Sequence, residues 1–269
     1  MHVALLLRAL QKTKLGSLAA PLLEEHAEHS TICAIYFSNI VEEKGVSLSD
    51  TMQLVKDVLH GTNLADIDLG SEPAGRVSRR EVIQHAAAYM YLRDFLKTEP
   101  LSEAAILEVH KIMMTSMKRE DGLLVQAGAY RTGEANAGYH RFPPATAMRS
   151  ALVRLVQQYN LLVTDPEEDP FALAAWLSYQ FVTIHPFEDG NGRMCRLLLN
   201  MVLLCRGVPF CSALGFCSSH RQAKKHYMQS IKEAREHNGK PRRLSFLSQS
   251  CCHGGESMHH GGNCMYAPH

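Results

Sequence analysis

The stretch TIHPFEDGNGRMCRLLLN, residues 183–200, decides the fold because it joins two apolar segments through a polar, glycine-rich turn. The helix before the turn is expected to end at His185, since a proline at the next position disfavours helical geometry in the residue before it and lacks an amide proton. A second helix is expected to begin near Gly192 and to carry the following leucines into a core. Residues 190–192 then form the joint between two buried helices.

Most of the remaining chain has the apolar spacing that is typical of helices. Ser47 and Asp169 are good helix-start signals, the latter because a proline follows it. Helices are expected at residues 47–60, 78–97, 102–117, 144–163, 170–184 and 219–236. Residues 128–144 interrupt this pattern with glycine, asparagine and proline, which predicts an extended excursion or hairpin. The predicted fold class is therefore all-α with one short non-helical element.

The overall composition indicates a soluble globular protein, because 269 residues, 46% of them hydrophobic, can bury a substantial core. A formal net charge of +1 creates no field that would attract nucleic acid or an anionic membrane. The apolar run near the N-terminus is too short to span a bilayer and is broken by Arg8, so no membrane segment is expected. A chain of this size needs no disulfides, and its eight cysteines favour reduced thiols in a cytoplasmic or nuclear protein.

Three regions are expected along the chain: an N-terminal segment at 1–28, a folded domain at 29–239 and a disordered tail at 240–269. The tail is rich in glycine, cysteine and histidine. Its cysteine and histidine spacings fit none of the usual zinc ligand pairs, which argues against a folded zinc module.

The turn at residues 190–192 has the chemistry of an anion-binding site. Backbone amides at a helix N-terminus converge on one spot, and glycines allow an anion to come close. Arg193 and Arg196 lie on one helical face and together can hold two phosphate groups. Asp189 fits beside phosphates if a divalent cation bridges its carboxylate to their oxygens. The residues therefore predict a site for a magnesium nucleotide.

His185 completes this chemistry as a candidate general base, since a neutral imidazole is available near neutral pH to take a proton from a hydroxyl. Each residue also has a structural alternative: a histidine that ends a helix, a surface turn, or solvated arginines. Their joint occurrence between two apolar helices favours the functional interpretation.

Residues 185–196, HPFEDGNGRMCR, fill every position of the HPFx(D/E)GNGRxxR signature, so the chain resembles the Fic-domain family. The similarity covers roughly residues 35–236, through AGAYR at 127–131 and KKHYMQSIKEA at 224–234. The resemblance implies the Fic fold, a helical bundle with a short β-hairpin flap over the active site. It also implies a protein adenylyltransferase, which transfers AMP from ATP to a serine, threonine or tyrosine hydroxyl of a target protein.

The resemblance assigns a role to each residue of the motif. His185 becomes the base that activates the target hydroxyl, and Asp189 the ligand of Mg²⁺, or of Mn²⁺ in its place. Asn191 and the two neighbouring glycine amides cradle the α- and β-phosphates. Relatives that phosphorylate their targets have lysine in place of Gly192, so the glycine favours AMP transfer, with phosphocholine transfer left open. The implied nucleotide-binding set is Asp189, Gly190, Asn191, Gly192, Arg193 and Arg196.

A second match, SNIVEEKGVSL at residues 38–48, resembles the inhibitory-helix pattern (S/T)xxxE(G/N) of many Fic proteins. Ser38 and Glu42 fill its defining positions, although Glu43 stands where glycine or asparagine is usual. The implied inhibitory helix spans about residues 30–43, and Glu42 would pair with Arg196 and keep the γ-phosphate from its productive place. An ordinary surface glutamate is the alternative.

Two other functions stay open beside autoinhibited AMP transfer. The same site could act as a phosphodiesterase that removes AMP, with Glu42 positioning the water. A nucleotide-binding regulatory protein with silent chemistry is the second alternative, and the intact His185 and Asp189 argue against it.

The flap implied by the resemblance spans residues 138–143, where a target segment would add as a strand. Its Gly138, Tyr139 and His140 are expected to contact the nucleotide. Tyr227 would stack in the adenine pocket, with packing in the core as the equal alternative. Besides ATP and the target protein, the family leaves a homodimer open as a partner.

Overall fold

The computed structural model describes residues 19–119, 121–137, 140–213, 229 and 231–232. Its elements are α2 (Ala19–Val41), α3 (Leu48–Leu59), α4 (Pro73–Phe95), α5 (Glu103–Met114), β1 (Asn136–Ala137), β2 (His140–Arg141), the 3-10 helix η1 (Ala145–Ala147), α6 (Met148–Leu162), α7 (Pro170–Ile184) and α8 (Asn191–Cys205). β1 and β2 pair antiparallel, with Asn136 opposite Arg141 and Ala137 opposite His140. This confirms the all-α class with a short hairpin.

Several predictions concern residues outside the described part of the chain. These are the first 18 residues of the N-terminal segment, Gly138 and Tyr139 of the flap, Tyr227 with most of the helix expected at 219–236, and the whole tail at 240–269. Their roles stay predictions, as do the domain limits.

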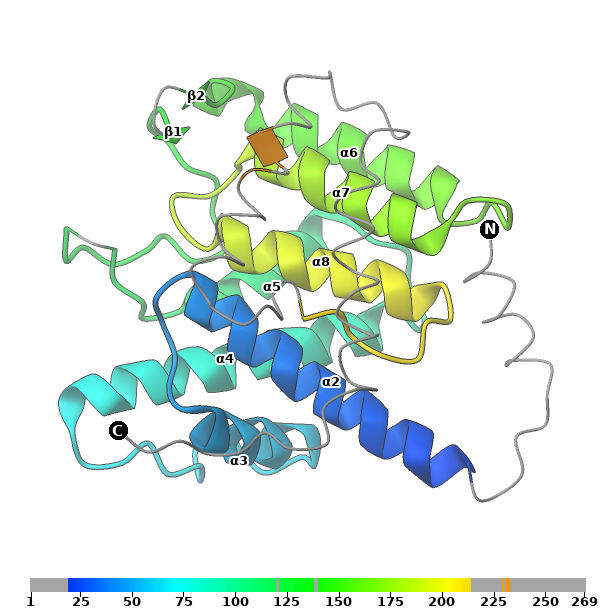
Figure 1. Cartoon of the computed structure of the whole chain (residues 1–269). Coiled ribbons are helices and arrows are strands. Elements are labelled where there is room, and N and C mark those ends of the chain that lie inside the picture. Colours follow the sequence, from blue (N-terminus) through cyan, green and yellow to red (C-terminus); the bar gives the residue numbers. More distant parts are fainter. Residues whose placement is uncertain (1–18, 120, 138–139, 214–228, 230, 233–269) are drawn as a thin grey trace.

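α7 and α8 lie against each other at the centre of the molecule, and the other helices surround this pair (Figure 1). α6 packs on α7, α5 packs on α4 and α6, and α2 contacts α3, α4 and α8. The main core includes the fully buried rings of Phe181 and Phe187, and a smaller core under α2 includes Ile32, Leu54 and Val82. In Figure 1 the loop between α7 and α8 lies beneath the β1–β2 pair.

The helix starts follow from local capping chemistry. The Ser47 hydroxyl accepts from the Asp50 amide at 3.1 Å, and the Asp169 carboxylate accepts from the amides of Phe171 and Ala172, both at 2.9 Å. Side-chain acceptors of this kind satisfy amides that a helix leaves open at its first turn. The bounds of α7 agree with the sequence prediction, residues 170–184.

Two helices begin earlier along the chain than predicted. α2 starts at Ala19, before the expected limit near residue 30, and α4 starts at Pro73 instead of residue 78. Proline suits the first helical position because its fixed backbone angle and missing amide cost nothing there. Within the described residues, no helix has both the length and the apolar character needed to cross a membrane.

Candidate functional site

The loop between α7 and α8 begins at His185, which adopts a left-handed backbone with φ of 52°. Its amide still donates to the carbonyl of Phe181 at 3.0 Å, while its own carbonyl accepts from Arg131 Nε at 2.8 Å. The imidazole ring stacks on Phe142, beside the flap, with ring centroids 3.9 Å apart. Backbone and ring of the predicted base are thus held from two sides.

The middle of the loop is fixed by Asn191. Its side-chain carbonyl accepts from the Phe187 amide at 3.0 Å, and its side-chain amide donates to the Phe187 carbonyl at 2.8 Å. The Asn191 side chain therefore holds the loop in the structure, and the predicted role of this residue toward phosphates stays a prediction. A phosphate contact from Asn191 would come from its backbone amide, which lies in the first turn of α8.

His110 of α5 supports the loop from below. Its Nδ1 accepts from the Gly128 amide at 2.9 Å, which leaves Nε2 as the donor to the Asp189 carbonyl at 3.0 Å. Burial lowers the pKa of His110 to about 4, so the ring is neutral near pH 7. Its ring also stacks on the ring of Phe187, with centroids 3.6 Å apart.

Gly190 has a left-handed backbone with φ of 79°, and a Cβ at this position would lie 2.8 Å from the Met114 sulfur. Both the backbone conformation and the lack of space therefore favour glycine here.

The N-terminus of α8 presents the donors that an anion needs. The first hydrogen bond into the helix is made by the Met194 amide, so the amides before it have no carbonyl partner in α8. Arg193, only 2% exposed, lies 3.6 Å from Glu81 of α4, and its Nε and Nη1 have no hydrogen-bond partner within the described residues. Burial raises the pKa of Glu81, an effect that Arg193 and Lys44 oppose. Buried donors without a partner in the protein need one from elsewhere, and a bound anion would supply it.

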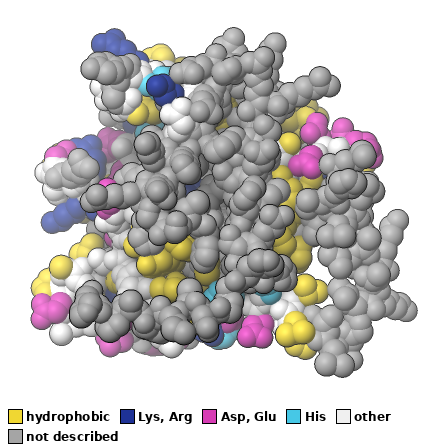
Figure 2. Space-filling view, in the orientation of Figure 1, with side chains coloured by type: hydrophobic (Ala, Val, Ile, Leu, Met, Phe, Trp, Pro, Cys, Tyr) yellow, Lys and Arg dark blue, Asp and Glu magenta, His cyan; other side chains and the backbone are white. Residues whose placement is uncertain are grey.

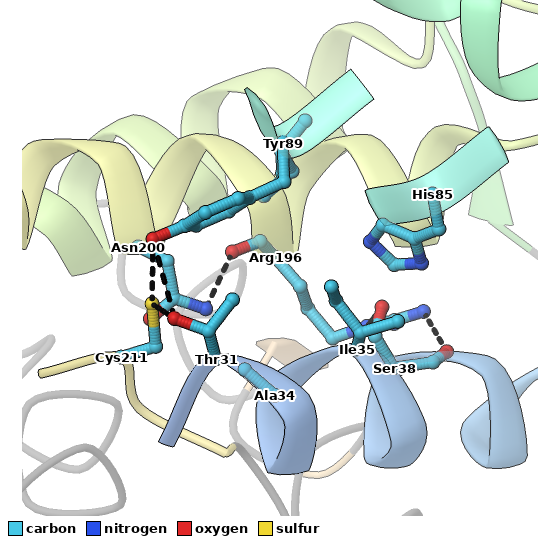
Figure 3. Close-up of a pocket in the computed structure, with 10 residues that line it drawn as sticks. Thr31, Ala34, Ile35, Ser38, His85, Tyr89, Arg196, Asn200 and Cys211 are labelled. Atoms are coloured by element: carbon cyan, nitrogen blue, oxygen red, sulfur yellow. Dashed lines mark hydrogen bonds between the residues drawn. The ribbon is translucent and has the colours of Figure 1, made fainter. Parts of the chain in front are cut away.

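Arg196 reaches from α8 across to α2 (Figure 3). Its Nε donates to the Ser38 hydroxyl at 2.9 Å, and its Nη2 donates to the Ser38 carbonyl at 2.8 Å and to Glu42 Oε1 at 2.6 Å. The arginine side chain is 4% exposed and that of Glu42 36%. His85 of α4 lies on the other side of the arginine and contacts Asn39 Oδ1 at 3.2 Å.

The Glu42 carboxylate also lies against Gly192, in the first turn of α8. A Cβ built at this glycine would overlap Glu42 Oε1 and would lie 3.2 Å from Arg196 Nη1. The carboxylate thus occupies the place beside the first turn of α8 where an anion is best stabilised.

A cavity of about 480 Å³ opens over this helix end. It brings together three predicted residues, Glu42, Asp189 and Arg193, and its other lining residues are Lys44, Lys118, Arg119, Asp121 and Glu188. Figure 2 shows basic and acidic side chains side by side along the left edge of the view. His185 does not line the cavity; it lies at the other end of the same loop, against the flap.

Comparison with known proteins identifies the domain. Residues 100–203 match the model of the Fic/DOC family. A Fido domain-containing protein from Dictyostelium discoideum is 44% identical over 89 residues, which are 33% of this chain and 62% of that protein. Protein adenylyltransferase Fic from Nematostella vectensis is 31% identical over 182 residues, 65% of this chain and 38% of that protein. The chain carries a Fic domain.

Solved structures of Fic proteins have the same fold. A Fic domain containing signaling protein from Bacteroides thetaiotaomicron superposes with a TM-score of 0.66 at 21% identity, over 91% of this chain and 89% of that one. Fic-1 from Caenorhabditis elegans gives a TM-score of 0.67 at 22% identity, over 95% of this chain and 70% of that one. The chain spans less than two thirds of the length of the two curated relatives above.

The structure also brings to the site residues that the sequence interpretation left without a role. Glu81 faces Arg193, Lys44 and Lys118 line the cavity, and Arg131 holds His185. Glu81 lies within a helix with no motif around it, and only Arg131 had a signal, the AGAYR match. His140 of the flap lies edge-on to Phe142 at 5.0 Å between ring centroids.

Asp189, the predicted ligand of a divalent cation, lines the cavity, and Glu188 beside it is paired with Arg119 at 3.1 Å. No group of three or more histidine, cysteine, aspartate or glutamate residues that could hold a metal occurs within the described part of the chain. Mg²⁺ usually binds through one or two carboxylates together with substrate phosphates. Asp189, in a cavity that Arg193 also lines, fits that mode of binding.

Proposed function

We propose that this chain is a protein adenylyltransferase that moves AMP from ATP to a serine, threonine or tyrosine hydroxyl of a target protein, and that Glu42 restrains it. The proposal is carried by one observation: the cavity at the N-terminus of α8 joins Asp189, the Glu42 carboxylate and the unpaired donors of buried Arg193. The names of the relatives support the class of reaction.

The nucleotide's phosphates would bind where the open amides of α8 and the Arg193 guanidinium converge. A guanidinium offers a planar set of donors that matches phosphate oxygens, and burial strengthens each bond. Mg²⁺ held by Asp189 would neutralise phosphate charge when bound. A bound phosphate would also give the buried donors of Arg193 hydrogen-bond acceptors. Glu81 does not, because its carboxylate lies 3.6 Å from Arg193 Nη1, which is longer than a hydrogen bond.

The transfer step needs one base. The neutral imidazole of His185 would take the proton of the target hydroxyl, whose oxygen attacks the α-phosphorus; the bond from the α-phosphorus to the bridging oxygen breaks, and pyrophosphate leaves. The contacts that hold His185 would contribute to the rate of transfer by fixing the position of its ring, since misplacement of a reacting group by about 1 Å can lower a rate by a factor of about 100.

Glu42 would restrain the reaction in two ways. Its carboxylate lies where a phosphate group gains most from the helix N-terminus, and it engages Nη2 of Arg196 at 2.6 Å. A triphosphate in the productive place would face this negative charge and would lack Arg196 as a donor. Release of the C-terminal end of α2 from α8 would remove both obstacles.

The position of Glu42 also supports a second candidate function, removal of AMP from a modified protein. A carboxylate within the cavity could orient a water molecule toward the phosphorus of an AMP-modified side chain. The two functions differ in their dependence on this residue: Glu42→Gly should raise transfer and abolish removal.

The test is incubation of the full chain with magnesium and ATP labelled at the α- or the γ-phosphate. We expect the Glu42→Gly protein to retain the α-label only and the additional substitution His185→Ala to abolish it. Label from the γ-position, or α-label that survives His185→Ala, would contradict the proposal.

A further inference from the structure

We propose that Arg131 is a positioning residue that holds the base His185 and the flap as one unit, so that target docking and base orientation are linked; this inference rests on the proposed function. Arg131 lies between α5 and β1 and is 3% exposed. It is the last residue of the AGAYR match at 127–131, yet it neither lines the cavity nor takes part in the ion pair of Glu42 with Arg196.

The guanidinium of Arg131 connects three separate pieces of backbone. Nε donates to the His185 carbonyl at 2.8 Å, Nη1 donates to the Gly133 carbonyl at 2.7 Å, and Nη2 donates to the Pro143 carbonyl. The backbone amide of Arg131 donates to the Pro186 carbonyl at 2.9 Å. One side chain therefore connects the start of the loop between α7 and α8 to the segments on both sides of the hairpin.

The His185 carbonyl needs such a donor. The last carbonyls of a helix have no amide partner within the helix, and a positive group near them is stabilising. His185 also has a left-handed φ of 52°, a conformation that is strained for a non-glycine residue and persists only where neighbouring contacts fix it. Arg131 is one of these contacts, and it acts on the residue that carries the base.

The flap reaches His185 by a second route. The Phe142 amide donates to the Ala135 carbonyl at 3.0 Å, which closes the hairpin beside β1 and β2, and the Phe142 ring stacks on the His185 ring. A target segment that adds to the hairpin would shift Gly133 and Pro143 only together with Arg131. The imidazole is thus oriented by the same segment on which the target would dock.

Lysine cannot replace Arg131 in this role. Arginine has five donors in a rigid planar fork, whereas lysine has three donors on a single nitrogen at the end of a flexible chain. Arg131→Lys keeps the charge and one or two hydrogen bonds, so the protein is expected to fold, but it cannot reach the carbonyls of all three segments at once.

The matched control is Arg206→Lys. Arg206 also holds loop carbonyls, with Nη1 donating to Val163 at 2.7 Å and Nη2 to Glu168 at 2.8 Å. It follows the C-terminus of α8, whereas the site lies at the N-terminus of that helix, about 20 Å away. Both variants should therefore lose a similar amount of stability, whereas only Arg131→Lys should affect the position of His185.

The experiment uses the full chain with Glu42→Gly and measures kcat, KM for ATP and hydrogen exchange of backbone amides. For Arg131→Lys we expect kcat to fall about 10- to 100-fold with KM for ATP within about threefold. Exchange should rise in residues 133–143 and 183–187 together. Arg206→Lys should change neither kcat nor exchange at these two segments.

Equal kcat losses in the two lysine variants, a rise in KM alone, or faster exchange at only one of the two segments would overturn the role of Arg131. Absence of label in every protein, including Glu42→Gly alone, would instead reject the proposed function. The exchange measurement would then still decide whether Arg131 joins the flap to the His185 loop.

Discussion

Replacement of Glu42 by glycine should increase AMP transfer, and the contacts of Glu42 in the structure determine the expected size of the increase. The substitution removes the carboxylate oxygen that accepts from Arg196 Nη2 at 2.6 Å and that lies against Gly192. Arg196 keeps its two hydrogen bonds to Ser38, so α2 stays attached to α8 and the fold is retained. The change therefore acts on one contact and not on the whole interface.

A hydrogen bond between charged groups contributes about 1.5–3 kcal/mol. Glu42 is about one third exposed, and solvent screens its charge, so we take about 1–2 kcal/mol for the restraint. This free energy corresponds to a rise in labelling of about 5- to 30-fold, since 1.4 kcal/mol is a factor of ten. The assay is the initial rate of incorporation of α-label from ATP into protein at saturating magnesium.

Glu43→Gly is the matched control, because it removes the same type of side chain one residue later. Glu43 has φ of 59°, which glycine adopts without strain. The variant should keep or strengthen the end of α2, with labelling equal to or below that of the parent. A rise of less than twofold for Glu42→Gly, or equal rises in both variants, would refute the assignment of Glu42 as the restraint.

Three other predictions follow from the contacts of the site. His185→Ala in the Glu42→Gly protein should reduce incorporation by a factor of about 10²–10⁴ while calorimetry finds unchanged ATP binding; weaker binding would mean that the histidine serves the nucleotide instead. Gly192→Ala should destabilise the parent more than it destabilises the Glu42→Gly protein, because the added methyl overlaps the Glu42 carboxylate; equal shifts in urea midpoint would contradict that geometry. Burial, reinforced by the charges of Arg193 and Arg196, lowers the pKa of His85 to about 3. The free energy of unfolding should therefore fall as the pH is lowered from 6.5 toward 3, by up to about 1.4 kcal/mol per pH unit. His85→Gln should reduce this pH dependence, as measured by urea denaturation.

The local part of the fold and of the site could be predicted from the sequence. The start of α7 follows from Asp169 and the proline after it, and its end follows from the proline after His185. The start of α8 next to the glycines and arginines of the motif follows in the same way, and the anion site expected there stays a prediction. Each of these inferences depends on residues within a few positions of one another.

Contacts between distant residues were beyond such reasoning. The bond from Arg131 to His185 spans 54 positions, and the approach of Glu81 to Arg193 depends on how α4 packs on α8. The pair of Glu42 and Arg196 was predicted only because a family resemblance supplied it. The side-chain bonds of Asn191 to the Phe187 backbone were likewise not foreseen, and its role toward phosphates stays a prediction.

The most direct test of AMP transfer is the intact mass of the Glu42→Gly protein after incubation with ATP and magnesium, followed by fragmentation of the modified peptide. The account predicts a mass increase of one AMP group on a serine, threonine or tyrosine hydroxyl, and no increase when His185→Ala is added. An increase of one phosphate group, or an unchanged mass with the protein folded and ATP bound, would contradict it.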